Sequence, residues 1–215
     1  MAGGRFITLE GGEGAGKSTH ARRLADRLAD RGIIVEVTRE PGGSPGAEEI
    51  RRLLVEGAVD RWSPMSEALL HYAARIDHMA RLVEPALESG RWVVCDRFAD
   101  STLAYQGYGH DLGLEAMLRL HQACLGDFQP DVTVILDLPV AEGLARARTG
   151  GNGGAREDRY ERMGSDFHQR LRDGFLDIAE CFPDRCVVVD ATRDKDDVAA
   201  AIWAAVTDKI DLDDE

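Results

Sequence analysis

Apolar and polar residues follow two alternating patterns along the chain. Short runs dominated by valine, isoleucine and leucine are each followed by a longer stretch in which apolar residues recur every three or four positions. Continuous apolar runs are typical of strands buried on both faces, so their alternation with helices predicts an α/β fold with a parallel sheet. The predicted strands are residues 5–10, 33–38, 91–96, 132–137 and 186–190. The predicted helices are residues 17–30, 46–55, 65–88, 114–125, 140–148, 160–181 and 195–209.

The longest predicted helix, residues 65–88, carries one apolar stripe. Its members, spaced three or four positions apart, are Leu69, Tyr72, Ile76, Met79 and Val83. This spacing puts them on one helix face, which we expect to be buried as part of the core.

Two glycine-rich stretches interrupt the pattern, at residues 40–46 and 149–155. Glycine at such density costs backbone entropy in an ordered element, so both are predicted to be mobile or specially shaped loops. The second is interpreted as part of a short Arg/Gly-rich lid at about residues 146–160. We predict a single domain over residues 1–210, followed by a solvated acidic tail at 211–215.

Composition and charge limit the possible partners. The chain has 215 residues, of which 44% are hydrophobic, and a formal net charge of −13. A chain of this length buries roughly 70% of its unfolded surface, enough for a core without disulfides or a structural metal. The acidic balance argues against nucleic acid and anionic membranes as partners, because such binders usually carry a basic field.

The expected location is the cytoplasm. No run approaches the roughly 18 apolar residues of a membrane span, and the first residues lead into a predicted strand instead of a signal peptide. The four cysteines are scattered, and the closest pair, Cys181 and Cys186, lacks the spacing and histidine partners of a zinc site. We interpret them as reduced thiols.

A nucleotide-binding loop follows the first predicted strand. Residues 11–18 fit the pattern G-x-x-x-x-G-K-[ST] and precede a predicted helix. The glycines let backbone N–H groups point into one concavity, to which the helix adds the positive end of its dipole. Lys17 would bridge the β- and γ-phosphates, and Ser18 would offer its hydroxyl to Mg²⁺. The predicted nucleotide-binding residues are Gly11, Gly12, Glu13, Gly14, Ala15, Gly16, Lys17, Ser18 and Thr19.

Asp96 and Arg97 stand at the end of the third predicted strand, where ligands bind in open α/β sheets. Asp96 is placed to hold Mg²⁺, and Arg97 is a bidentate fork for phosphate. Because the loops after the first and third strands must share one Mg²⁺, we expect these strands to be neighbours, in the sheet order 2-3-1-4-5 with helices on both faces. Taken alone, an Asp-Arg pair is as often a salt-bridged turn, and a P-loop leaves ATPase, GTPase and small-molecule kinase open.

Two further stretches narrow the choice. Residues 38–44 read Thr-Arg-Glu-Pro-Gly-Gly-Ser, and residues 101–107 read Ser-Thr-Leu-Ala-Tyr-Gln-Gly. With the P-loop, Asp96-Arg97-Phe98, and the Asp-Arg-Tyr-Glu of residues 158–161, they give the whole chain a resemblance to the thymidylate kinase family. That resemblance implies a P-loop kinase that transfers the γ-phosphoryl group of ATP to dTMP, giving dTDP and ADP, with Mg²⁺, for dTTP biosynthesis. It also implies a homodimer, although the stripe in residues 65–88 equally fits a monomer core.

The resemblance implies roles for individual residues. It places Glu13 between donor and acceptor, near Mg²⁺ and the sugar of dTMP, with Arg97 and Arg51 on the dTMP phosphate. Arg75 resembles the residue that hydrogen-bonds the thymine edge, and Tyr105 the residue under the sugar that leaves no room for a 2′-hydroxyl. The implied metal ligands are Ser18, Asp96 and Glu13. The implied substrate contacts are Glu40, Pro41, Arg51, His71, Arg75, Arg97, Ser101, Thr102, Tyr105 and Gln106.

The base-stacking position departs from the family pattern. The family usually has phenylalanine or a similar aromatic residue one helical turn before Arg75, whereas this chain has His71, followed by Tyr72. Either ring is a candidate for the stacking contact with thymine, and Tyr72 also belongs to the apolar stripe.

The lid is expected to supply catalytic arginines. The P-loop carries Gly14 and Ala15 where some family members have an arginine, which matches the branch whose catalytic arginines come from the lid. Closure over ATP would bring one or two lid arginines onto the transferred phosphoryl group. Those that bracket the glycine-rich loop are Arg146, Arg148, Arg156 and Arg159. The predicted catalytic residues are Glu13, Lys17, Arg97, Arg148, Arg156 and Arg159, with the order among the last three left open.

Two alternative functions fit part of this pattern. A kinase for another small acceptor would share the scaffold but leave Arg75, Thr102 and Tyr105 unexplained. A switch that reads GTP would normally need an Asn/Thr-Lys-x-Asp element late in the chain, and with lysine only at positions 17, 195 and 209 the sequence has none. The sequence therefore predicts a kinase that acts on dTMP.

Overall fold

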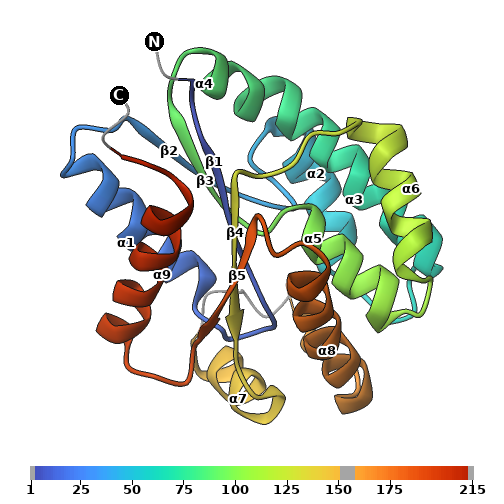
Figure 1. Ribbon diagram of the computed structural model, residues 1–215. Coiled ribbons are helices and arrows are strands. Elements are labelled where there is room, and N and C mark those ends of the chain that lie inside the picture. The colour runs from blue at the N-terminus through green and yellow to red at the C-terminus, as the bar shows by residue number, and fades with distance from the viewer. Residues whose placement is uncertain (1–2, 151–157, 213–215) are drawn as a thin grey trace.

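Five parallel strands form a sheet at the centre of the computed structural model, which describes residues 3–150 and 158–212 (Figure 1). They are β1 (Phe6–Glu10), β2 (Val35–Arg39), β3 (Trp92–Asp96), β4 (Val132–Asp137) and β5 (Cys186–Asp190). Their order is β2-β3-β1-β4-β5. The predicted strands and their order are confirmed, with small shifts at the strand ends.

β1 is the central strand, and its register places the site. Leu9 pairs with Asp96 of β3 on one side and with Val134 of β4 on the other. Because parallel strands end at the same edge, the P-loop after β1 and Asp96 at the end of β3 leave the sheet together. The predicted adjacency of the first and third strands is confirmed.

Helices cover both faces of the sheet (Figure 1). α1 (Lys17–Ala29) and α9 (Lys195–Lys209) lie together on one face, over a core that includes Leu9. Successive strand residues point to opposite faces, so Phe6 belongs to a second core on the other face. That second face carries the segments that line the cleft described below.

The remaining helices lie between β2 and β5 along the chain. They are α2 (Pro45–Val55), α3 (Pro64–His78), η1 (Met79–Val83), α4 (Glu84–Glu88), α5 (Ala99–Thr102), η2 (Leu103–Gly109), α6 (Leu114–Leu125), α7 (Val140–Gly150) and α8 (Ser165–Cys181). Figure 1 shows α2, α3, α5, α6 and α8 on the side of the sheet opposite α1 and α9, with α7 beyond the end of β4. In the described part of the chain, no helix is both long and apolar enough to cross a membrane.

Side-chain caps fix where α2 and α3 begin. Ser44 accepts a hydrogen bond from the backbone N–H of Ala47, and Ser63 does the same for Ser66. In both helices proline takes the first helical position, where its missing N–H costs nothing. Each helix therefore starts one residue before the predicted bound.

The long predicted helix exists, and Tyr72, Met79 and Val83 of the predicted stripe are buried. α3, η1 and α4 run continuously, with a π-helical turn in the middle. Tyr72 is buried, whereas Leu69 and Ile76 are 51% and 45% exposed, so the prediction for these two was wrong. The face that α3 buries includes the charged Arg75 and Glu67. Counting only apolar residues therefore missed the charged part of the buried face of α3.

Two local elements differ from the sequence prediction. Residues 99–109, interpreted from sequence only as a chemical motif, form the helical turns α5 and η2. α8 begins at Ser165, after Gly164, instead of at residue 160. Residues 158–163 are therefore not part of that helix. They form a separate turn that includes the last residues of the predicted lid.

Candidate active site

The P-loop forms the tight connection between β1 and α1. Gly14 has a φ of +69°, and a Cβ there would lie 2.0 Å from the carbonyl oxygen of Gly143 in α7, so this position requires glycine. α1 begins at Lys17 and directs its N-terminus at the loop. Lys17 Nζ donates to the carbonyl oxygens of Gly11 and Gly12 at 3.1 and 2.6 Å. Burial lowers the pKa of Lys17 to about 8, so most of the ammonium is charged at neutral pH.

Two of the predicted metal ligands meet beside the P-loop. Ser18 Oγ donates a hydrogen bond to Asp96 Oδ2, which joins the start of α1 to the end of β3. A hydroxyl and a carboxylate suit Mg²⁺, which takes oxygen ligands and keeps several waters. Over residues 3–150 and 158–212, no group of three or more His, Cys, Asp or Glu side chains could hold a metal. The other ligands of an ion here would therefore be waters and substrate phosphates.

Arg97 is held in a left-handed backbone conformation, with a φ of +72°, which costs energy in a residue other than glycine. Its Nη1 donates to the Gly11 carbonyl oxygen at 3.0 Å and to Ser101 Oγ at 3.1 Å. Its Nη2 donates to Glu13 Oε1 at 3.1 Å. The ring of Tyr105 lies 5.0 Å from the guanidinium carbon. These contacts gather Arg97, Glu13 and Tyr105 where the P-loop meets the second face.

Glu13 joins the P-loop to this group. It accepts hydrogen bonds from Arg97 and from the Tyr105 hydroxyl. Burial alone would raise its pKa, but the charges of Arg97 and the P-loop lysine lower the pKa of Glu13 to about 2. The side chain is therefore an anion that faces the cleft, whereas Ser18 and Asp96 pair with each other.

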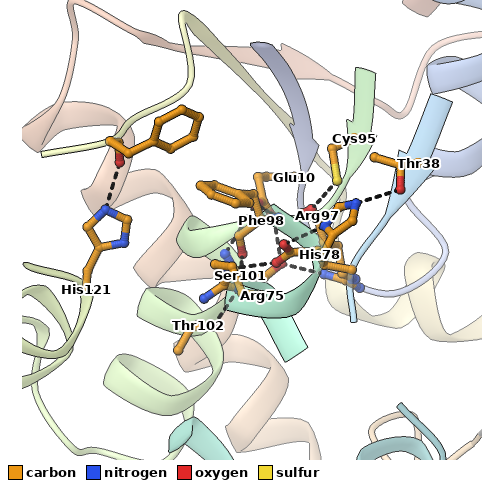
Figure 2. A network of polar contacts seen from close by, with 12 residues as sticks. Glu10, Thr38, Arg75, His78, Cys95, Arg97, Phe98, Ser101, Thr102 and His121 are labelled. Carbon is orange, nitrogen blue, oxygen red and sulfur yellow. Dashed lines mark hydrogen bonds and ion pairs between the residues drawn. The ribbon is translucent and has the colours of Figure 1, made fainter. Parts of the chain in front are cut away.

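Glu10 is a site residue that the sequence analysis missed. It is fully buried at the end of β1, where it accepts from the backbone N–H of Phe98 at 2.7 Å and from Ser101 Oγ at 2.6 Å (Figure 2). These bonds hold the turn that contains the strained Arg97. Burial, and then the charge of Asp100, raise the pKa of Glu10 to about 7. A glutamate at the end of a mostly apolar strand was the available signal.

A cleft lined by polar and aromatic side chains opens beside the P-loop. Of the predicted substrate contacts, it is lined by Glu40, Pro41, Arg51, His71, Arg75, Arg97, Ser101, Tyr105 and Gln106. Residues that line it without having been predicted to do so are Val55, Phe98, Tyr160 and Glu161. Thr102 does not line the cleft, but its Oγ1 accepts a hydrogen bond from Arg75 Nη2 at 3.1 Å. Glu13 of the P-loop also lines the cleft, which thus brings together residues from five separate stretches of sequence.

Arg75 is 1% exposed and is fixed on several sides. Its Nε donates to Glu40 Oε2 at 2.7 Å, and its Nη2 donates to the Phe98 carbonyl oxygen at 2.9 Å. The other oxygen of Glu40 bonds His78 Nδ1 at 3.0 Å, so three buried polar groups form one chain, of which Figure 2 labels Arg75 and His78. Within the described residues, Arg75 Nη1 is buried without a hydrogen-bond partner. A buried donor without a partner is costly, so this position favours a ligand with an acceptor atom.

Two more predicted contacts are held by their neighbours. Arg51 Nη1 donates to the Pro41 carbonyl oxygen at 2.8 Å, which joins α2 to the loop after β2. Gln106 Nε2 donates to Glu67 Oε1 at 2.7 Å, which joins η2 to α3. Both side chains therefore enter the cleft from fixed positions.

The choice between the two candidate stacking rings is clear from their positions. Tyr72 is 1% exposed and packs on Arg75, with 4.7 Å from the guanidinium carbon to the ring centroid, and it does not line the cleft. His71 does line the cleft, and its Nε2 shares a hydrogen bond of 2.9 Å with the Tyr160 hydroxyl. His71 is therefore the ring of the two that faces the cleft.

The predicted lid arginines differ in exposure and in their bonding partners. Arg148 is exposed near the end of α7, whereas Arg146 bonds the Ala191 carbonyl oxygen and Glu142. Arg156 lies outside the described residues.

Arg159 differs from the prediction of a phosphate-facing lid residue. It is 0% exposed, and its guanidinium donates to the carbonyl oxygens of Leu54, Ala58 and Val59 while pairing with Glu67. These contacts turn it toward the end of α2 and away from the P-loop. In sequence, an arginine beside a flexible loop gives no indication of which way it points.

Known proteins resemble this chain over nearly its whole length. Residues 9–202 match the family model described as thymidylate kinase. A protein named thymidylate kinase from Caulobacter vibrioides is 56% identical over 212 residues, covering 99% of this chain and all of that protein. One of the same name from Nitrobacter hamburgensis is 51% identical over 207 residues, covering 96% and 90% of the two chains. A crystal structure of thymidylate kinase from Ehrlichia chaffeensis has a TM-score of 0.75 at 33% identity, covering 95% and 99%.

Proposed function

The chain belongs to the thymidylate kinase family, and from this premise we propose that its active site divides into a phosphate half and a base half. The protein is a kinase that phosphorylates dTMP. The phosphate half comprises the P-loop, Asp96 and Arg97. The base half is the part of the cleft around Arg75 and His71. The observation that carries this division is the Glu13–Arg97 pair, at which the P-loop and the cleft share one wall.

The P-loop holds the phosphates of ATP. Its backbone N–H groups and the N-terminus of α1 supply partial positive charge, and Lys17 adds a full one. Phosphoryl transfer requires little covalent chemistry from a protein and depends on positioning and charge neutralisation. Lys17 is suited to both, because its carbonyl partners hold it across the loop.

Ser18 and Asp96 fit Mg²⁺ and would hold it at the edge of the P-loop. When bound, the ion neutralises charge on the transferred phosphoryl group and its neighbour. Glu13 was implied as a third ligand, but its bonds to Arg97 and Tyr105 favour a role facing the acceptor.

The acceptor dTMP occupies the cleft. Arg97 grips its phosphate with the help of Arg51, which enters from α2. Tyr105 lies under the sugar, where its ring leaves no room for a 2′-hydroxyl. Arg75 offers its buried, unpartnered Nη1 to an acceptor on the base edge, such as a carbonyl oxygen of thymine.

Arg148 is our candidate for the lid arginine that reaches the transferred phosphoryl group. Its exposed side chain stands near the end of α7, which packs against the P-loop through Gly143. The Arg156 assignment stays a prediction from the sequence.

The proposed assembly is a homodimer in the cytoplasm. Four apolar side chains of α2 and α3 are exposed: Leu53, Met65, Leu69 and Ile76. A second copy of the chain would cover this face, as the family resemblance implies. Replacing Leu69 and Ile76 by glutamate should yield monomers in sedimentation velocity, whereas glutamate at exposed Ile34 should leave the dimer intact. A monomeric wild-type protein would refute the assembly.

Arg97→Ala tests the proposed division. Turnover should fall about a thousandfold, because a preorganised charge at the transferred group is lost. The KM for ATP should stay within about twofold, since Arg97 serves the acceptor. Arg81→Ala, on the surface of η1, is the control. An equal loss of ATP affinity in Arg97→Ala would contradict the assignment.

A further inference from the structure

The turn at residues 158–163 is fastened to the wall of the cleft by Arg159. Three carbonyl oxygens between Leu54 and Val59 accept from its guanidinium at 2.8 to 3.2 Å, and Glu67 of α3 pairs with it. All of these contacts are remote in sequence, so the turn is held by α2, α3 and the residues between them.

This fastening places the next residue, Tyr160, inside the cleft. Its hydroxyl and His71 Nε2 are 2.9 Å apart, and the two rings are tilted at 43° with centroids 6.2 Å apart. On its other side Tyr160 meets Tyr105 edge-on, with centroids 5.3 Å apart. Tyr160 therefore bridges the ring that faces the base and the ring that faces the sugar.

Both partners of the His71–Tyr160 bond are neutral near pH 7. Burial lowers the pKa of His71 to about 4. Burial, and then the charge of Glu67, raise the pKa of Tyr160 well above its usual value. A neutral imidazole has one N–H and one bare nitrogen, and each is costly to bury without a partner. Tyr160 satisfies Nε2, which a hydrocarbon ring at position 71 would not require.

We propose that Tyr160 is a positioning residue for His71: its hydroxyl fixes the imidazole plane as the wall on which the nucleobase of dTMP packs. The inference rests on the proposed placement of dTMP in the cleft. Arg159 and Glu67 support it by holding the turn that carries Tyr160. His71 and Tyr160 thus act as a pair, and either residue alone makes a poorer wall.

A double-mutant cycle tests the pair. Tyr160→Phe removes one oxygen and should raise the KM for dTMP roughly tenfold, because a buried nitrogen of His71 loses its partner. In the background of His71→Phe, which has no nitrogen to satisfy, the same change should alter this KM by less than about twofold. The KM for ATP should stay within about twofold in all four proteins. Tyr108→Phe removes a hydroxyl bonded to Asp177 outside the cleft and should leave dTMP binding unchanged.

The outcomes separate the inference from the function on which it rests. If Tyr160→Phe raises the KM for dTMP only when residue 71 is histidine, the result supports the pair. The inference is overturned if Tyr160→Phe raises the KM for dTMP equally with histidine and with phenylalanine at position 71, or in neither case. It is also overturned if Tyr160→Phe lowers the melting temperature but leaves the KM for dTMP unchanged. His71→Ala should raise the KM for dTMP by itself. If neither His71→Ala nor Tyr160→Phe affects dTMP, then the placement of dTMP in the cleft fails.

Discussion

The phosphate half and the base half of the site are built in different ways. The phosphate half rises from the ends of two adjacent strands, and much of it is backbone: the P-loop amides, the N-terminus of α1 and the carbonyl oxygens that hold Lys17. The base half consists of side chains from α2, α3, η2 and the turn at 158–163. In the proposed division, phosphate binding would therefore depend largely on backbone at two neighbouring strand ends. Base recognition would depend on contacts between residues such as His71 and Tyr160, which are 89 positions apart.

The largest expected effect is in the phosphate half. Lys17→Ala should lower turnover by at least about a thousandfold, because the charge nearest the transferred group is lost. Calorimetry should show that the Kd for dTMP stays within about twofold, since the base half is intact. Lys195→Ala, at the exposed start of α9, should change neither turnover nor the Kd for dTMP. If Lys17→Ala loses dTMP binding as strongly as turnover, the two halves are not separable.

The base half should depend on its buried ion pair for stability. Glu67 has its pKa lowered to about 2, because the His110 side chain, 3.4 Å away, and the charge of Arg159 outweigh the effect of burial. A lowered pKa stabilises the fold above the unfolded value near 4.5, and the gain is lost as the pH falls toward 2. Glu67→Gln should therefore cost about 3 kcal/mol at pH 7 and progressively less below pH 4.5.

Urea unfolding at several pH values measures this cost. Glu115→Gln is the matched control, because its pair with Arg119 is exposed and should contribute less than about 0.5 kcal/mol. A cost for Glu67→Gln that does not change between pH 7 and pH 3 would show that the carboxylate charge is not what holds the turn.

The smallest of these effects is expected where the halves meet, at Tyr105. Tyr105→Ala should raise the activity with the ribose form of the acceptor, relative to dTMP, by about tenfold, because the ring that blocks a 2′-hydroxyl is gone. Tyr105→Phe keeps the ring and should keep the preference for deoxyribose. Measurement of kcat/KM for both acceptors distinguishes the two variants. A loss of preference in Tyr105→Phe would assign the discrimination to the hydroxyl and its bond to Glu13.

The same contrast explains what the sequence could predict. The sheet, its order and the P-loop follow from contiguous patterns: apolar strands, a glycine loop and a strand-end aspartate. Glu10 and Tyr160 were missed because their partners are remote in the chain. Arg159 was placed in the lid because a charge beside a glycine loop looks the same whether it points inward or outward. Leu69 and Ile76 were assigned to the core because α3 buries charged residues that an apolar count ignores.

The division into two halves is tested most directly by comparing two arginine variants with two acceptors. The measurement is kcat/KM for dTMP and for dCMP in wild type, Arg75→Ala and Arg97→Ala, by ADP release at saturating ATP. We predict that Arg97→Ala lowers both values by a similar factor and leaves their ratio within about threefold. Arg75→Ala should reduce the preference for dTMP by at least about tenfold, because dCMP presents an amino donor where thymine presents an acceptor. A ratio that is unchanged in Arg75→Ala, or that collapses in Arg97→Ala, would contradict the account.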